Sequence, residues 1–224
     1  MSGKKIRIAI DGPAGSGKST IARLLAERLG YTYLDTGAMY RALTLIAIEE
    51  GIDPADGEAL AERLHSMEIR LEPGRTFIGY DDVSEAIRTP RVDALVSQVC
   101  AHPAVRREMV RRQREGAQIN SIIMEGRDIG TVVLPDAEIK LFLTATSLSR
   151  AKRRAKQLEQ AGIDFDLEAL ESDIIRRDRM DSTRADSPLR KAEDAIEIDN
   201  TDETLIESVD HIERIVRNYL EDNN

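Results

Sequence analysis

The sequence has little of several features that decide a protein's class. It has one cysteine, no tryptophan and 4% aromatic residues among 224. Because Cys100 has no partner in the chain, no internal disulfide can form, which is typical of a reducing compartment, and we expect a cytoplasmic location. No run of 18 apolar residues is present, so we expect no membrane span and no membrane partner. The apolar run at residues 6–10 is short and contains Arg7, which does not suit a secretory signal.

Net positive charge is also absent. The 41 acidic residues exceed the 32 Lys and Arg residues, giving a formal net charge of −9. Generic nucleic-acid binders more often carry net positive charge, so we expect no nucleic-acid partner. Arginines outnumber lysines strongly. This excess reflects either genome composition or a need for guanidinium groups, which bind phosphates through two hydrogen bonds.

Short β-branched apolar runs alternate with segments of helical periodicity along most of the chain. The runs predict strands at residues 5–10, 31–34, 122–124, 139–143 and 195–198. The periodic segments predict helices at residues 18–29, 38–50, 58–64, 103–115, 147–160 and 166–181, and a last helix capped by Asn200 with Glu203. Apolar strands separated by helices are typical of a parallel sheet covered on both faces. The predicted fold class is therefore α/β, with a five-stranded parallel sheet.

One segment breaks this alternation. Residues 68–71 and 76–80 alternate between apolar and polar side chains, and Pro73-Gly74 lies between them. Pro-Gly suits the centre of a type II turn, so the segment predicts an antiparallel hairpin. A hairpin within a chain of this kind indicates an inserted subdomain, which we place at residues 66–100. The core is then expected to comprise residues 1–65 and 101–224, a length that suits one domain with a small insert.

A glycine-rich turn joins the first predicted strand to the first helix. It reads Gly12-Pro13-Ala14-Gly15-Ser16-Gly17-Lys18-Ser19-Thr20, which fits G-x-x-x-x-G-K-[ST] in the required strand–turn–helix context. The glycines let successive N–H groups point at one anion, and the helix start adds its positive dipole end. Lys18 is predicted to reach the β- and γ-phosphates, and Ser19 is predicted to ligate the Mg²⁺ of MgATP. The loop alone predicts nucleoside triphosphate binding, which GTPases, motor ATPases and small-molecule kinases share.

Two further motifs follow predicted strands. Asp35-Thr36-Gly37-Ala38-Met39-Tyr40-Arg41 follows the second strand, and Glu125-Gly126-Arg127-Asp128-Ile129-Gly130-Thr131-Val132-Val133 follows the third. The Asn-Lys-x-Asp motif of GTPases is missing. With the phosphate loop, these motifs closely resemble the bacterial cytidylate kinase family over nearly the whole chain. One departure is Glu125, where some members of that family have Asp.

The resemblance implies transfer of the γ-phosphate of ATP to CMP and to dCMP, with a mobile lid at about residues 151–165 and an insert that enlarges the nucleotide site. It implies substrate-binding positions, which are Thr36, Arg41, Ser97, Arg106, Arg127, Asp128, Arg177, Asp181 and Arg184. Among these, Ser97, Arg106 and Asp128 would contact cytosine. It also implies a catalytic set, which we take as Lys18, Arg127, Arg150 and Arg154.

The chemistry of these residue types agrees with that reading. Cytosine presents an N4 amine beside an N3 acceptor, which a carboxylate and a guanidinium complement, whereas uracil reverses both groups. Arg177, Asp181 and Arg184 are spaced i, i+4 and i+7, so they would share one face of a continuous helix. Transfer to a phosphate needs positioning and charge neutralisation rather than a covalent intermediate.

Alternatives stay open at this point. A kinase of the same fold could act on another nucleotide or a small metabolite. A non-catalytic nucleotide-binding module or switch would share the phosphate loop but would need no arginines for a second phosphate. Individual arginines could instead form solvated ion pairs of little energetic weight. We expect a monomer that acts on small molecules.

Overall fold

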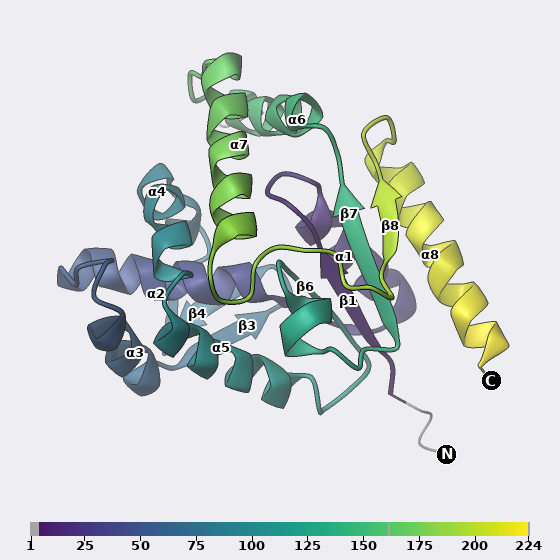
Figure 1. The fold of residues 1–224 in the computed structure, drawn as a ribbon, viewed down its shortest axis with the longest axis horizontal. Coiled ribbons are helices and arrows are strands. Elements are labelled where there is room, and N and C mark those ends of the chain that lie inside the picture. The colour runs from purple at the N-terminus through teal and green to yellow at the C-terminus, as the bar shows by residue number, and fades with distance from the viewer. Residues whose placement is uncertain (1–4, 161, 224) are drawn as a thin grey trace.

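The computed structural model describes residues 5–160 and 162–223. Its main sheet has five strands in the order β2-β6-β1-β7-β8, and every neighbouring pair is parallel (Figure 1). The strands are β1 (Arg7–Asp11), β2 (Thr32–Asp35), β6 (Ile122–Gly126), β7 (Ile139–Thr144) and β8 (Ile196–Asp199). This sheet confirms the predicted fold class, and each strand lies within two residues of its predicted bounds.

Helices cover both faces of the sheet. The α helices of the described residues are α1 (Lys18–Leu29), α2 (Thr36–Glu50), α3 (Gly57–Ser66), α4 (Pro90–Val99), α5 (Pro103–Gly116), α6 (Ser147–Gln160), α7 (Leu167–Thr183) and α8 (Leu205–Asp222). Successive residues of β1 point to opposite faces. Ile8 and Ile10 therefore pack with α1 and α8, while Ala9 packs with Val110 of α5 and the turn after β6. The burial of these apolar side chains fixes the carboxyl ends of the strands beneath α6 and α7 (Figure 1).

The predicted hairpin is present as a separate three-stranded antiparallel sheet of β3 (Ile69–Glu72), β4 (Arg75–Ile78) and β5 (Asp81–Asp82). Gly74 lies in its turn with a φ of 74°. The third strand and helix α4 were not predicted. Buried side chains of α4 share a core cluster with α2, α3 and α5, so apolar packing joins this segment to the rest of the chain. The insert boundaries at residues 66 and 100 stay a prediction.

The predicted cap of the last helix is wrong. Thr204 caps α8, with its hydroxyl accepting from the Glu207 N–H at 3.3 Å and the Glu207 carboxylate accepting from the Thr204 N–H at 2.8 Å. Asn200 has other partners, since its amide donates to the Ser16 carbonyl at 2.9 Å and accepts from Arg153 at 3.0 Å. The Asn200 side chain already forms hydrogen bonds with Ser16 of the phosphate loop and with Arg153, so it does not cap α8.

Within the described ranges, none of the helices combines the length and apolar character needed to cross a bilayer.

Candidate active site

The phosphate loop lies between the end of β1 and the start of α1. Gly12 has a φ of 150°, and a Cβ there would lie 2.0 Å from the backbone oxygen of Leu143 in the neighbouring strand. Gly17, with a φ of 91°, caps α1 in the left-handed conformation. Glycine at these two positions lets the loop curl close to the sheet. The hydroxyl of Ser16 is buried, and within the described part of the chain it has no hydrogen-bond partner.

Lys18 is buried at the first position of α1. Its Nζ donates to the carbonyl of Pro13 across the loop at 2.8 Å. Burial, and next the nearby Arg127, lower the pKa of this amine to about 7, although the carboxylates of Glu125 and Asp11 oppose the shift. A bound anion would favour the charged amine, because it would supply the countercharge that the buried site lacks.

Glu125 lies at the end of β6 and directly opposite Asp35 in the register of β2 and β6. Its Oε1 accepts a hydrogen bond from the Ser19 hydroxyl at 2.7 Å. Burial, followed by repulsion from Asp35, raises the pKa of Glu125 to about 7. The Thr36 hydroxyl donates to the backbone oxygen of Glu125 at 2.7 Å, which ties the second motif to the third.

These oxygens suit a hard cation that arrives with a nucleotide. Mg²⁺ prefers oxygen ligands and often binds through one or two protein groups plus phosphate oxygens. The hydroxyl of Ser19 and the carboxylate of Glu125 provide such ligands. No group of three His, Cys, Asp or Glu side chains able to hold a metal by itself occurs in the part of the chain that the structure describes. The donor set therefore fits MgATP better than a permanent metal centre.

One cavity of about 900 Å³ joins the three motifs. Parallel pairing brings Asp11, Asp35 and Gly126 to the same edge of the sheet, where ligands bind in open α/β folds. The predicted site residues that line the cavity are Ala14, Gly15, Gly17, Lys18, Ser19, Thr20, Thr36, Arg41, Ser97, Arg106, Arg127, Asp128, Arg154, Arg177, Asp181 and Arg184. Gly12, Pro13, Ser16 and Arg150 lie outside this lining.

Arg150 is buried behind the phosphate loop. Its guanidinium donates to the carbonyl of Ala14 at 2.8 Å, to the carbonyl of Ala145 at 2.9 Å and to Asp178 at 2.6 Å. These bonds hold the loop against α6 and α7. The structure thus gives Arg150 a supporting position, and its predicted catalytic role stays a prediction.

Asp128 lies buried between two arginines. Its carboxylate forms a charge-assisted hydrogen bond with Arg106 and an ion pair with Arg184 at 3.7 Å. Arg106 also donates to the carbonyl of Cys100 at 3.3 Å, and its guanidinium carbon lies 5.7 Å from the centre of the Tyr40 ring. Three residues predicted for the substrate, Arg106, Asp128 and Arg184, therefore form one cluster of ion pairs.

The condition of one continuous helix through Arg177, Asp181 and Arg184 is not met. Helix α7 ends at Thr183, so Arg184 lies just beyond it with extended backbone and donates to the carbonyl of Ser187 at 2.6 Å. Asp181 is on the helix and accepts a 2.9 Å hydrogen bond from Arg127. The predicted helix at residues 166–181 and the observed α7 both end before Arg184, so only Arg177 and Asp181 are on the helix.

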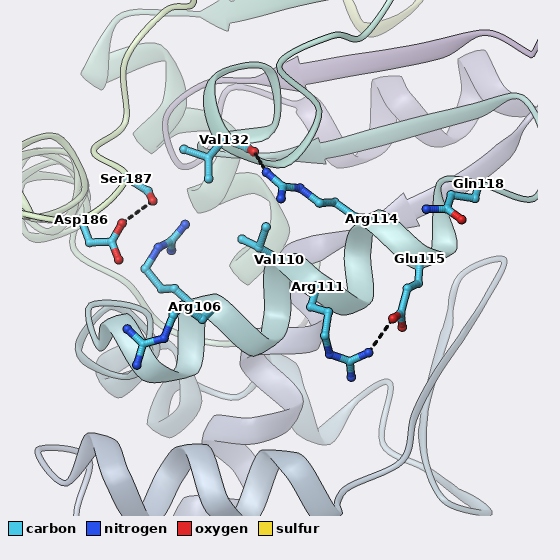
Figure 2. Close-up of a pocket in the computed structure, with 10 residues that line it drawn as sticks. Arg106, Val110, Arg111, Arg114, Glu115, Gln118, Val132, Asp186 and Ser187 are labelled. Carbon is cyan, nitrogen blue, oxygen red and sulfur yellow. Dashed lines mark hydrogen bonds and ion pairs between the residues drawn. The ribbon is translucent and has the colours of Figure 1, made fainter.

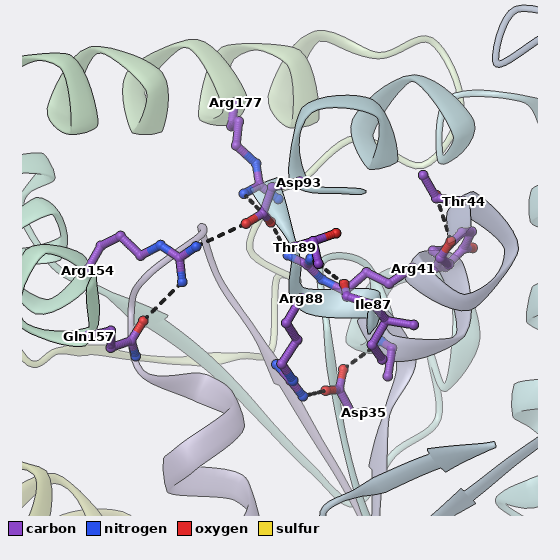
Figure 3. Close-up of polar contacts among 12 residues, drawn as sticks. Asp35, Arg41, Thr44, Ile87, Arg88, Thr89, Asp93, Arg154, Gln157 and Arg177 are labelled. Carbon is purple, nitrogen blue, oxygen red and sulfur yellow. Dashed lines mark hydrogen bonds and ion pairs between the residues drawn. The ribbon is translucent and has the colours of Figure 1, made fainter. Parts of the chain in front are cut away.

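Asp93 is a central residue that sequence reasoning missed. It accepts from Arg41 at 2.6 Å and from Arg154 at 3.0 Å, and it forms an ion pair with Arg177 at 3.6 Å (Figure 3). Only its position in the predicted insert, close to Ser97, could have drawn attention to it.

Asp11 is a second missed residue. Its buried carboxylate accepts from the N–H groups of Ile129 and Gly130 at 2.8 and 2.7 Å. Those residues begin a one-turn π-helix (Ile129–Val133) that directly follows Asp128. The sequence could have indicated Asp11, because a carboxylate at the end of a buried apolar strand requires a hydrogen-bond partner.

A smaller cavity of about 440 Å³ lies on the outer side of α5 (Figure 2). Arg111 there pairs with Glu115 at 2.6 Å, and Arg114 donates to the carbonyl of Val132 at 2.6 Å. The lining of this cavity includes Arg106 but no residue of the phosphate loop at residues 12–20, so this cavity is not the candidate active site.

The comparisons with known proteins agree with the geometry. The family model described as cytidylate kinase matches residues 8–218. A cytidylate kinase from Anoxybacillus flavithermus is 53% identical over 222 residues, which covers 97% of this chain and 99% of the relative. One from Bacillus subtilis is 49% identical over 213 residues, which covers 93% and 95%. A solved structure of an uncharacterized protein from Eubacterium ventriosum shares the fold, with a TM-score of 0.50, 16% identity and coverage of 97% of this chain and 99% of that one. The family match over most of the chain and the close relatives confirm the resemblance seen in the motifs, and the chain belongs to the cytidylate kinase family.

Proposed function

We propose that this protein transfers the γ-phosphate of ATP to CMP, and also to dCMP. One observation carries the proposal, which is that the phosphate loop and a second set of arginines line the same cavity. A nucleotide-binding switch needs only the loop. A kinase whose acceptor is itself a phosphate needs cationic groups for both substrates.

The ATP side of the site is built from the loop at residues 12–20. Its backbone N–H groups and Lys18 bind the phosphates, while Ser19 and Glu125 supply oxygens for Mg²⁺. When bound, Mg²⁺ neutralises charge on the phosphoryl group in transfer. Arg154, which lines the cavity from α6, is suited to act on the transferred group once the lid closes.

The acceptor side uses residues from the other motifs. Thr36, Arg41 and Arg127 bind the phosphate of CMP, and Arg177, Asp181 and Arg184 bind its sugar and phosphate; all of them line the cavity. Near neutral pH a phosphate monoester is largely dianionic, since its second pKa is about 6. Its oxygen can therefore attack without a strong general base, and the residues act by positioning and charge neutralisation.

Cytosine recognition rests on Asp128, Arg106 and Ser97. A carboxylate has about four acceptor sites. On Asp128, Arg106 occupies one of them, while Arg184 lies 3.7 Å away as an ion-pair partner. The remaining acceptors suit the N4 amine of cytosine. Uracil would leave the buried carboxylate facing a carbonyl oxygen, which is unfavourable.

The rival candidate is a kinase of the same fold for another acceptor, and product identification separates the two. Purified protein is incubated with MgATP and CMP, and the nucleotides are resolved by anion-exchange chromatography. We expect equal amounts of CDP and ADP. Release of ADP without CDP, or no reaction, would contradict the proposal. A monomer acting in the cytoplasm stays the prediction from the sequence.

A further inference from the structure

Three arginines from three different helices meet at one carboxylate. Arg41 of α2, Arg154 of α6 and Arg177 of α7 all pair with Asp93, which lies in the first turn of α4 (Figure 3). Both carboxylate oxygens are used, with Oδ1 taking Arg41 and Arg177 and Oδ2 taking Arg154. Asp93 therefore connects α4, which lies in the predicted insert, to α2, α6 and α7.

Helix stability alone does not account for this arrangement. A carboxylate in the first turn of a helix is favoured by the helix dipole, and that benefit requires no arginine. In residues 5–160 and 162–223, Asp93 is the only carboxylate that pairs with any of these three arginines. Three guanidinium groups of like charge are thus held together by one negative group.

The cluster of Asp93 with Arg41, Arg154 and Arg177 has positive charge and a hydrogen-bond donor left to bind an anion. Three positive charges face one negative charge, so the cluster carries a formal excess of two positive charges. The Nε of Arg177 is buried and has no hydrogen-bond partner among the residues that the structure describes. Asp93 and all three arginines line the cavity that also contains Lys18 and Ser19. A phosphate dianion matches both the charge excess and the free donor.

We propose that Asp93 is a positioning residue that occupies Arg41 and Arg177 of the acceptor-phosphate site, together with Arg154, until the phosphate of the substrate takes over their donors. This inference rests on the proposed function, because that function assigns Arg41 and Arg177 to the acceptor. No covalent bond changes, since one anion replaces another on the same guanidinium groups. Asp93 keeps the arginines converged in the free enzyme, and its charge opposes the arriving phosphate.

The net effect on binding follows from the charges. A carboxylate beside a bound dianion repels it whether or not the original pairs have broken. Arg41 stays anchored without Asp93, because it also donates to the carbonyl of Ile87 at 3.1 Å. Neutralising Asp93 should therefore tighten phosphate binding by roughly threefold to tenfold, the scale of a partly exposed ion pair.

The test compares CMP with cytidine, which lacks the phosphate. Dissociation constants for both are measured calorimetrically on the wild type and on Asp93→Asn, Asp93→Ser and Asp93→Glu. We expect the first two variants to bind CMP more tightly while their affinity for cytidine stays within twofold. Asp93→Glu keeps the charge and should stay near the wild type. Asp173→Asn is the matched control, because Asp173 lines the same cavity but, in residues 5–160 and 162–223, pairs only with Arg176.

Equal or weaker CMP binding by both neutral variants would overturn the role of Asp93, and so would an equal change for cytidine. If the wild type neither binds nor phosphorylates CMP, the proposed function fails and the inference fails with it. If the wild type does both and the neutral variants bind CMP no better, only the inference fails.

Discussion

The hydroxyl of Ser19 donates a 2.7 Å hydrogen bond to Oε1 of Glu125, which joins the end of the phosphate loop to the end of β6. The carboxylate lies next to the hydroxyl that is expected to ligate Mg²⁺, and burial raises its pKa to about 7. A cation bound there would hold Glu125 in its ionised form.

The first prediction concerns Glu125→Gln. The amide keeps the shape of the side chain but loses the charge that favours Mg²⁺. We expect the Mg²⁺ concentration for half-maximal activity to rise about tenfold to a hundredfold, the scale of losses at residues that support metal ligands. Steady-state rates are measured across a Mg²⁺ series, with Glu115→Gln on the exposed face of α5 as the control. An unchanged Mg²⁺ dependence would rule out this role.

The second prediction concerns Lys18→Ala. The buried amine is the cationic side chain of the phosphate loop, so its loss should reduce kcat by about 10²–10³-fold. CMP affinity should change little, because the acceptor arginines remain. The exposed Lys152→Ala on α6 serves as the control. Near-normal turnover of Lys18→Ala would contradict the mechanism.

The third prediction concerns Asp128→Asn. The amide can accept from Arg106 but presents donors where the N4 amine of cytosine would donate. We expect the ratio of kcat/KM for CMP over UMP to fall by roughly 10²-fold. A ratio equal to that of the wild type would show that Asp128 does not read the base. Asp128→Ala is a poorer probe, because it leaves buried Arg106 without its carboxylate.

The fourth prediction concerns Asp11 and pH. Burial raises the pKa of its carboxyl from its ordinary value of 3.8 to about 6, so the folded state holds this proton more tightly than the unfolded state. The resulting contribution to stability is complete below about pH 4 and is lost as the pH rises through 6. Between pH 7 and pH 5 the wild type should gain about 1 kcal/mol relative to Asp11→Asn. Urea unfolding of both proteins at each pH measures this difference, and a difference that stays constant with pH would contradict the assignment.

Much of the fold was predictable because local patterns determine it. The apolar runs at residues 122–124 and 139–143 could be buried only as strands, and the phosphate loop carries its own glycine signals. Helix α4 escaped because its apolar positions Val92, Val96 and Val99 form a narrow stripe next to an expected hairpin. The π-helical turn after Asp128 depends on Asp11, which is more than a hundred residues away along the chain.

The site was predictable as a set of positions but not as a set of contacts. Family motifs indicated Arg41, Arg154 and Arg177 individually. Their convergence on Asp93 depends on how α2, α4, α6 and α7 are arranged in space, which spacing along the chain does not encode. The contacts of Asn200 were also not predictable from spacing along the chain. Its hydrogen bonds to Ser16 and Arg153 are long-range, and they replace the helix cap that the sequence predicted.

The central claim is that the cavity beside the phosphate loop accepts CMP. It is tested most directly by kcat/KM in an ADP-release assay with MgATP and CMP, dCMP, UMP, AMP or GMP as acceptor. We predict high values for CMP and dCMP, a value lower by roughly 10²-fold for UMP, and no ADP above background for AMP and GMP. Strong ADP release with AMP or GMP and none with CMP would contradict the account.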